Sequence, residues 1–161
     1  MAALDVVEKE IARLEEYLDQ AMEEVFGKMM GVTCSHAVEV DPMEGETVAA
    51  LIGLAGALTG TLVLQSTRDG AMRICGCLTG QESTEVDETV RDAIGEVGNM
   101  VAGAWKGHDT ELASRCLLST PTVVVGSRYE LFSRRALIRI DRSYRFDQYS
   151  CAITVSCQRA T

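Results

Sequence analysis

The sequence predicts an α+β domain in which helices pack on a largely antiparallel β-sheet. Three observations support this class. A helical pattern opens the chain, a second lies past its middle, and β-rich runs separated by turn residues stand on both sides of the second. The order is therefore helix, strands, helix, helix, strands. Because no linker or low-complexity run interrupts it, we expect one domain over residues 1–161, with an N-terminal helical extension over about residues 1–18.

The individual elements follow from hydrophobic spacing and from turn residues. Residues 4–30 predict one long helix or two short ones, because apolar side chains recur at three- and four-residue steps, and Gly31 is a natural stop. Residues 32–40 predict a strand. Residues 47–54 and 58–66 predict two strands joined by a glycine-containing turn. The remaining expected elements are a short helix over 67–78, a long helix over 87–106, and strands over 122–125, 130–132, 136–142 and 151–156.

Composition excludes several classes of partner. The chain has 161 residues, of which 47% are hydrophobic and 24% charged, and its net charge is -9. Such a balance argues against binding to nucleic acid or to an anionic membrane surface, both of which favour a basic face. The longest apolar stretch, residues 48–64, is interrupted by three glycines and two threonines, so it predicts strands and no membrane span. With no signal-peptide pattern at the N-terminus, we expect the cytoplasm.

Cysteine and histidine spacing gives no metal motif. The six cysteines form no C-x-x-C pair, and His36 and His108 have no near neighbour at the spacing of a zinc site. In a cytoplasmic protein such thiols are expected to be reduced and buried as small hydrophobic groups. We therefore expect no bound metal on this chain.

The helix over residues 87–106 separates an apolar side from a polar side. Its core-facing stripe, at helical spacing, consists of Val90, Ile94, Val97, Val101 and Trp105. The opposite side carries Asp92, Glu96, Asn99 and Gly103. Glu96 and Asn99 stand three residues apart, which places their Cβ atoms roughly 5–6 Å apart on an ideal helix. Both are expected to point away from the core, on a face that water or a partner can reach.

Three glycines interrupt this helix although each is unfavourable in a helix interior. Gly98 falls on the core side, where it would permit close packing. Gly95 and Gly103 fall toward the open side, where the missing side chains would let a partner's backbone approach. A glutamate three residues before an asparagine also occurs on ordinary solvated helices, so the pair alone identifies no reaction. Asp92 is either a solvated acid or a partner contact, and Met100 either core edge or an apolar contact.

A resemblance to a known protein family indicates a function that the spacing of residues alone does not. Residues 92–103 (DAIGEVGNMVAG) resemble the signature helix of the CheC, CheX and FliY phosphatases, whose hallmark is E-x-x-N on an exposed helix. Residues 50–61 resemble the strand–turn–strand of that family, and residues 119–126 resemble its P-T-x-x-x-G segment. The similarity extends over roughly residues 20–157. A single E-x-x-N favours the CheX branch over the CheC branch, which typically carries two. A weak echo at residues 24–27 keeps a glutamate but has Gly27 where Asn99 stands.

The resemblance implies a chemotaxis phosphatase that hydrolyses the aspartyl phosphate of a CheY-like response regulator. Asn99 would orient the attacking water, because an amide both donates and accepts hydrogen bonds. Glu96 would dock on the lysine of the receiver. The expected partner contacts are Asp92, Gly95, Met100 and Gly103. No cofactor is expected on this chain, Mg²⁺ is expected in the receiver, and the family implies a homodimer.

Two other classes of protein remain open. One is a non-catalytic module of the same fold that only binds a receiver or serves as a scaffold. The other is a structural component of a flagellar switch, as in the FliY branch, against which the lack of extra domains argues. Retention of Asn99 favours catalysis, because a binding module would not need that amide.

Overall fold

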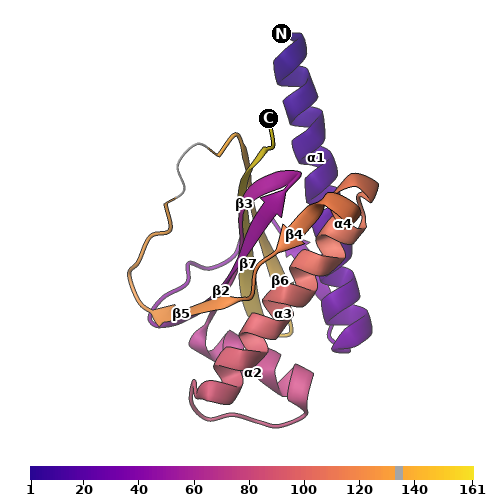
Figure 1. Ribbon diagram of the computed structural model, residues 1–161. Helices are drawn as coiled ribbons and strands as arrows, with labels where there is room; N and C mark the ends of the chain where they lie inside the picture. The colour runs from indigo at the N-terminus through magenta and orange to yellow at the C-terminus, as the bar shows by residue number, and fades with distance from the viewer. Residues whose placement is uncertain (133–135) are drawn as a thin grey trace.

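The computed structural model describes residues 1–132 and 136–161, and it consists of one antiparallel sheet with helices packed on one of its faces (Figure 1). The helical elements are α1 (Ala2–Met22), the π-helical η1 (Glu23–Met29), α2 (Arg68–Thr79), α3 (Glu88–Gly107) and α4 (Thr110–Arg115). The strands are β1 (Cys34–Ala37), β2 (Thr47–Gly56), β3 (Leu58–Thr67), β4 (Cys116–Leu118), β5 (Thr122–Gly126), β6 (Ile138–Phe146) and β7 (Tyr149–Arg159). The expected α+β class is thereby confirmed.

The described strands form a seven-stranded sheet in the order β1-β6-β7-β3-β2-β4, and β5 also pairs with β2. Every pairing is antiparallel. The expected hairpin is present as β2 and β3, with Leu51 opposite Val63. Its turn contains Gly56, whose φ of +99° favours glycine. β4 and β5 lie one after the other along the same edge of β2, and α3 contacts all three of these strands.

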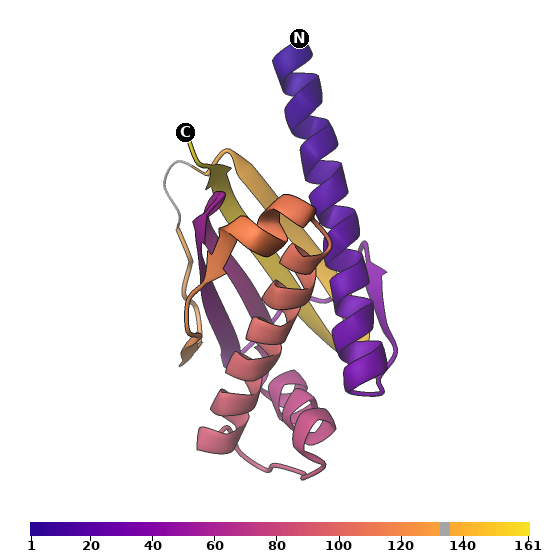
Figure 2. The same ribbon diagram turned by 45° about the vertical axis from the view of Figure 1, so that its right-hand side comes forward.

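The first helix is longer and more tightly attached than a free extension. α1 continues directly into η1, and Gly31, with φ of +73°, follows the end of η1 as expected for a stop. Leu14 and Leu18 are fully buried, so one side of α1 packs into the core well before residue 18. The N-terminal end of α1 projects beyond the rest of the molecule (Figure 2), whereas Glu10 still forms an ion pair with Arg159 of β7.

Polar contacts fasten α1 to the domain. Arg142 on β6 donates two hydrogen bonds to the carboxylate of Asp19, at 2.9 and 2.8 Å, and the Tyr144 hydroxyl donates to the same carboxylate at 2.6 Å. The indole Nε1 of Trp105 on α3 donates to the backbone oxygen of Leu14 at 3.0 Å. These contacts satisfy groups that would otherwise be buried without partners.

The structure corrects several expected elements. Residues 130–132 were expected to form a strand, but they are irregular; Leu131 and Phe132 instead border a hollow on the uncovered face of the sheet. β1 is shorter than the expected strand, and β6 begins at Ile138. The sequence did not predict α4 or β4. Asp109 caps the N-terminus of α4, because its side chain accepts hydrogen bonds from the backbone N–H groups of Glu111 and Leu112. The helix itself has only six residues, which are too few to show a periodic hydrophobic pattern in the sequence.

Candidate functional site

The central helix α3 carries the candidate site, and local sequence accounts for where it starts and how it lies. The side chain of Asp87 caps its first turn by accepting a hydrogen bond from the backbone N–H of Val90 at 3.0 Å. The expected apolar stripe is buried, and it includes Val90, Ile94, Val97, Val101 and Trp105. Because one side of α3 is buried against the sheet and against α1, the residues half a turn away stand on the surface.

Glu96 and Asn99 stand on that surface. Glu96 is exposed and Asn99 is half-buried, so both lie where a partner can reach them, as expected. Over residues 1–132 and 136–161, neither side chain forms a hydrogen bond or an ion pair with the rest of the chain. Unengaged polar groups on a rigid helix are available to a substrate without any internal contact having to break first.

The three glycines in the interior of α3, which ends at a fourth, Gly107, have different surroundings. A Cβ on Gly98 would lie 2.9 Å from the Cβ of Ala50, so Gly98 permits the close approach of α3 to β2, as expected. Gly103 has open space where its side chain would be, also as expected. Gly95 differs: it is buried, and a Cβ there would lie 3.3 Å from the Cβ of Pro121 and 3.4 Å from a methyl group of Val123.

The expectation that Gly95 lies on the open side was therefore wrong. An ideal helix places Gly95 next to Asn99, one turn earlier on nearly the same face. The chain between β4 and β5, at residues 119–121, covers that edge of the helix. Nothing in the spacing of α3 itself reveals this cover, because it comes from a segment more than twenty residues later in the sequence.

The remaining side chains of this face fall into two groups. Asp92 is exposed and lies one turn before Glu96, so it can contact a partner. Met100 is half-buried and packs against the core, so at most its edge is available. Lys106 is occupied, because its ammonium group donates to the backbone oxygens of Cys116 at 2.8 Å and Ala113 at 3.4 Å.

The echo of the motif in the N-terminal helix has no comparable site. Glu24 lies in η1, and its Oε1 atom is 2.8 Å from Nε2 of His108, close enough for an ion pair with a charged imidazole. The His108 ring also stacks on Tyr17, with centroids 5.9 Å apart. Glu24 is thus directed at an internal partner, and Gly27 supplies no amide side chain.

Three thiols that are largely or fully buried, those of Cys34, Cys151 and Cys157, are poor nucleophiles at neutral pH. Burial raises the pKa of Cys34 to about 12, with the charge of Asp19 adding to the rise, and burial raises the pKa of Cys157 to about 12. Burial also raises the pKa of the fully buried Cys151. Thiols with such pKa values stay protonated near neutral pH, and only the thiolate is a strong nucleophile.

Metal binding and membrane insertion find no support in the described part of the chain. In residues 1–132 and 136–161, no cluster of three or more His, Cys, Asp or Glu side chains is arranged to hold a metal ion. In the same residues, no helix has the length and apolar character needed to span a membrane.

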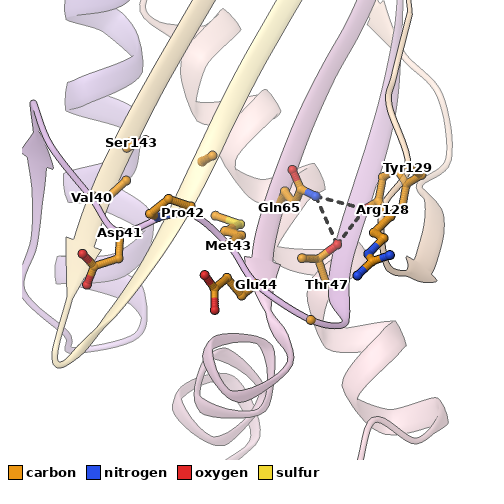
Figure 3. A pocket seen from close by; sticks show the side chains of 12 residues that line it. Val40, Asp41, Pro42, Met43, Glu44, Thr47, Gln65, Arg128, Tyr129 and Ser143 are labelled. Atoms are coloured by element: carbon orange, nitrogen blue, oxygen red, sulfur yellow. Dashed lines mark hydrogen bonds between the residues drawn. The ribbon is translucent and has the colours of Figure 1, made fainter.

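A large hollow lies on the other face of the sheet, away from α3 (Figure 3). It has a volume of about 810 Å³, and the loop over residues 40–45 forms one wall. On its floor, the amide of Gln65 donates to the hydroxyls of Thr47 and Tyr129, at 3.1 and 3.2 Å. Glu96 and Asn99 line neither this hollow nor the neighbouring one of about 310 Å³. An acid–amide pair outside a cavity suits a macromolecular substrate that brings its own reaction centre.

This architecture, an antiparallel sheet with helices on one face, is the fold of the CheX and CheC-like proteins. The chain belongs to the chemotaxis phosphatase CheX family, which residues 48–141 match. The CheY-P phosphatase CheX of Thermotoga maritima is 27% identical over 95 residues, which make up 58% of this chain and 61% of that protein. The match thus spans about three-fifths of the length of this relative.

Solved structures show the same fold over nearly the whole chain. The chemotaxis protein CheX from Vibrio vulnificus superposes with a TM-score of 0.78 at 21% identity, covering 92% of this chain and 98% of that one. The CheX of a CheX–CheY–BeF₃–Mg²⁺ complex from Borrelia burgdorferi superposes with a TM-score of 0.69 at 15% identity, covering 89% and 97%. At these identities the likeness concerns the fold alone.

Proposed function

We propose that this chain is a phosphatase that hydrolyses the aspartyl phosphate of a CheY-like response regulator in chemotaxis signalling. The observation that carries the proposal is the pair Glu96, which is exposed, and Asn99, which is half-buried; they stand three residues apart on the surface of α3, with no side-chain partner among the residues that the structure describes. Family membership supports it, as does a relative named CheY-P phosphatase and another crystallised in complex with CheY.

In this proposal α3 inserts its exposed face into the reaction centre of the receiver. Asn99 holds the attacking water, with its Oδ1 accepting a hydrogen bond from the water and its Nδ2 donating one to a phosphoryl oxygen. Glu96 pairs with a lysine of the receiver and so fixes α3 against the phosphoryl group. An ion pair formed as water is excluded is stronger than one on an open surface. Asp92, the edge of Met100 and the space over Gly103 complete the contact.

The reaction requires no covalent intermediate on this chain. The water oxygen attacks phosphorus opposite the aspartyl oxygen, the bond between phosphorus and that oxygen breaks, and its electron pair stays on the regenerated carboxylate. The protons of the water leave with inorganic phosphate and the solvent. Mg²⁺, expected in the receiver and not on this chain, supplies charge neutralisation when bound. Positioning and electrostatics therefore account for the acceleration.

The test is the rate of phosphate loss from a phosphorylated CheY-like receiver with and without this protein. We expect the wild-type chain to accelerate it and Asn99→Ala to lower the acceleration on the order of a hundredfold, because a misplaced water costs that much. Gln81→Ala, an exposed amide outside α3, is the matched control and should behave as wild type. Equal acceleration by the wild type and Asn99→Ala would instead indicate a module that binds the receiver without catalysing the reaction.

We also propose that the chain forms a homodimer through the exposed edges of its sheet. The outer edge of β1 and the outer edge of β5 have no pairing strand among the described residues. Unpaired edges bind other strands readily. Light scattering that detects only a species of 17.4 kDa would exclude this dimer.

A further inference from the structure

The segment Ser119–Pro121, between β4 and β5, forms a β-bulge beside the candidate site. Leu54 of β2 pairs with Leu118, and Leu51 pairs with Thr122. Between these two pairs β2 has two residues, 52 and 53, whereas the opposing strand has three, 119–121. One extra residue in one strand defines a bulge, and bulges are frequent next to active sites, where they redirect side chains.

Hydrogen bonds hold this bulge on the sheet. The Ser119 side chain accepts a hydrogen bond from the backbone N–H of Gly53 at 2.7 Å and donates one to the backbone oxygen of Thr120 at 2.9 Å. The backbone N–H of Ser119 also donates to the oxygen of Gly53 at 2.9 Å. The ring of Pro121 fixes its own φ angle. The bulge is thus pinned at one end by Ser119 and stiffened at the other by Pro121.

Pro121 meets α3 at Gly95, one turn before Asn99. The virtual Cβ of Gly95 lies 3.3 Å from the Cβ of Pro121, which is closer than real Cβ atoms normally pack. α3 therefore has two contacts that depend on glycine: Gly98 against Ala50 of β2, and Gly95 against the bulge. The first sets how close the helix lies to the sheet. The contact of Gly95 with the bulge limits how far the helix can tilt or shift toward β5. Asn99 stands four residues, about one turn, after Gly95, so such a shift would move Asn99 as well.

We propose that the Ser119–Pro121 bulge, through its contact with Gly95, is a positioning element that fixes where Asn99 stands on α3 relative to the docked substrate. The inference rests on the proposed phosphatase function and goes beyond it by assigning a role to residues outside α3. Ser119, Pro121 and Gly95 touch no reacting atom. They act by preventing a shift of the helix, because the bulge is stiff and the helix yields first when a methyl group is added between them.

The test adds atoms at Gly95 in steps. Gly95→Ala places a methyl group 3.3 Å from Pro121, and Gly95→Val adds a branched side chain. Misplacing a reacting group by 1 Å can lower a rate about a hundredfold. We therefore expect kcat for receiver dephosphorylation to fall about threefold in Gly95→Ala and about thirtyfold in Gly95→Val, with KM nearly unchanged in both. Gly76→Ala in α2, whose Cβ would lie no closer than 3.5 Å to its nearest neighbour, is the matched glycine-to-alanine control and should keep wild-type kinetics.

A second substitution separates positioning from general damage. Pro121→Gly removes the ring that Gly95 meets, and we expect it to lower kcat about twofold because the bulge loosens. In that background Gly95→Ala should cost clearly less than threefold, since only the contact with the Val123 methyl group at 3.4 Å is left; contacting residues commonly show such non-additive effects. An equal threefold loss in both backgrounds, or wild-type kcat in Gly95→Val, would overturn the proposal.

A spectroscopic readout keeps this result independent of the proposed function. The side-chain amide resonance of Asn99, assigned by its loss in Asn99→Ala, should move in Gly95→Ala and return toward its wild-type position in the double variant with Pro121→Gly. If the wild-type chain fails to accelerate dephosphorylation, the phosphatase proposal fails while this measurement still tests the bulge. A resonance unmoved in folded Gly95→Ala would reject the positioning role even if the enzyme is active. Should Gly95→Val not fold, the two alanine-based comparisons carry the test.

Discussion

The molecule has two long helical segments: the continuous segment of α1 and η1, and the helix α3. They carry similar residues in different surroundings. Both are amphipathic, and both carry a glutamate followed closely by glycine. In the first segment two acids have internal partners: Asp19 binds Arg142 and Tyr144, and Glu24, the glutamate of the incomplete motif, faces His108. In α3 the corresponding groups, Glu96 and Asn99, have none among the described residues. The comparison teaches that an available acid is recognised by its lack of an internal partner, which the spacing of one helix cannot reveal.

Charge reversal at the two glutamates should give the largest contrast. We expect Glu96→Lys to lower kcat/KM for receiver dephosphorylation about a hundredfold, because a lysine would face the receiver's lysine, while the melting temperature stays unchanged. Glu24→Lys should leave kcat/KM within about twofold and cost about 1 kcal/mol of stability. Steady-state kinetics and thermal melts of both variants check this. Similar kinetic losses in the two variants would remove the distinction between the helices.

Loss of the Asp19 carboxylate should reduce stability and leave catalysis intact. Asp19→Ala leaves the Arg142 guanidinium and the buried Tyr144 hydroxyl without their acceptor. Because Asp19 itself is partly exposed, we expect about 2 kcal/mol less free energy of unfolding, from the range for a hydrogen-bonded charged group. Urea unfolding measures it. Exposed Glu16→Gln, on the same helix, is the control and should unfold like the wild type.

The buried thiols predict a smaller effect, confined to alkaline pH. The pKa of Cys34 is raised from 9.0 to about 12, mainly by burial, so the folded chain keeps this thiol protonated where the unfolded chain has lost its proton. Its contribution to stability is complete below pH 9 and is lost as the pH rises toward 12. Urea midpoints measured from pH 8 to pH 11 should therefore fall, and less steeply in Cys34→Ala. Parallel slopes for the two proteins would contradict the assignment.

Completing the E-x-x-N motif in the N-terminal helical segment should leave the dephosphorylation rate unchanged. Gly27→Asn restores an E-x-x-N sequence in η1, and there is open space for the new side chain. We expect no gain in dephosphorylation rate, and no rescue of Asn99→Ala, because Glu24 is directed at His108. Activity regained in the double variant would show that the motif alone suffices and that its surroundings do not matter.

Sequence reasoning reached the placement of Glu96 and Asn99 because the apolar stripe of α3 fixes the opposite side by periodicity alone. It failed at Gly95, because the residues that cover this side of α3 belong to the bulge at 119–121. The bulge can be recognised only once the pairing of these residues with β2 is known. Sequence reasoning could not foresee that Glu24 faces His108, since 84 residues separate them in the chain. The strand expected at 130–132 failed for a related reason. Its composition is suitable, but no strand of the described sheet lies beside it to pair with.

The most direct measurement is saturation kinetics of receiver dephosphorylation for the wild type, Asn99→Ala and Glu96→Gln on the same phosphorylated receiver. If Asn99 orients water and Glu96 docks the helix, Asn99→Ala lowers kcat on the order of a hundredfold with KM little changed, whereas Glu96→Gln raises KM about tenfold. A wild-type protein that leaves the phosphate-loss rate of the receiver unchanged, or an Asn99→Ala variant with wild-type kcat, would contradict the account.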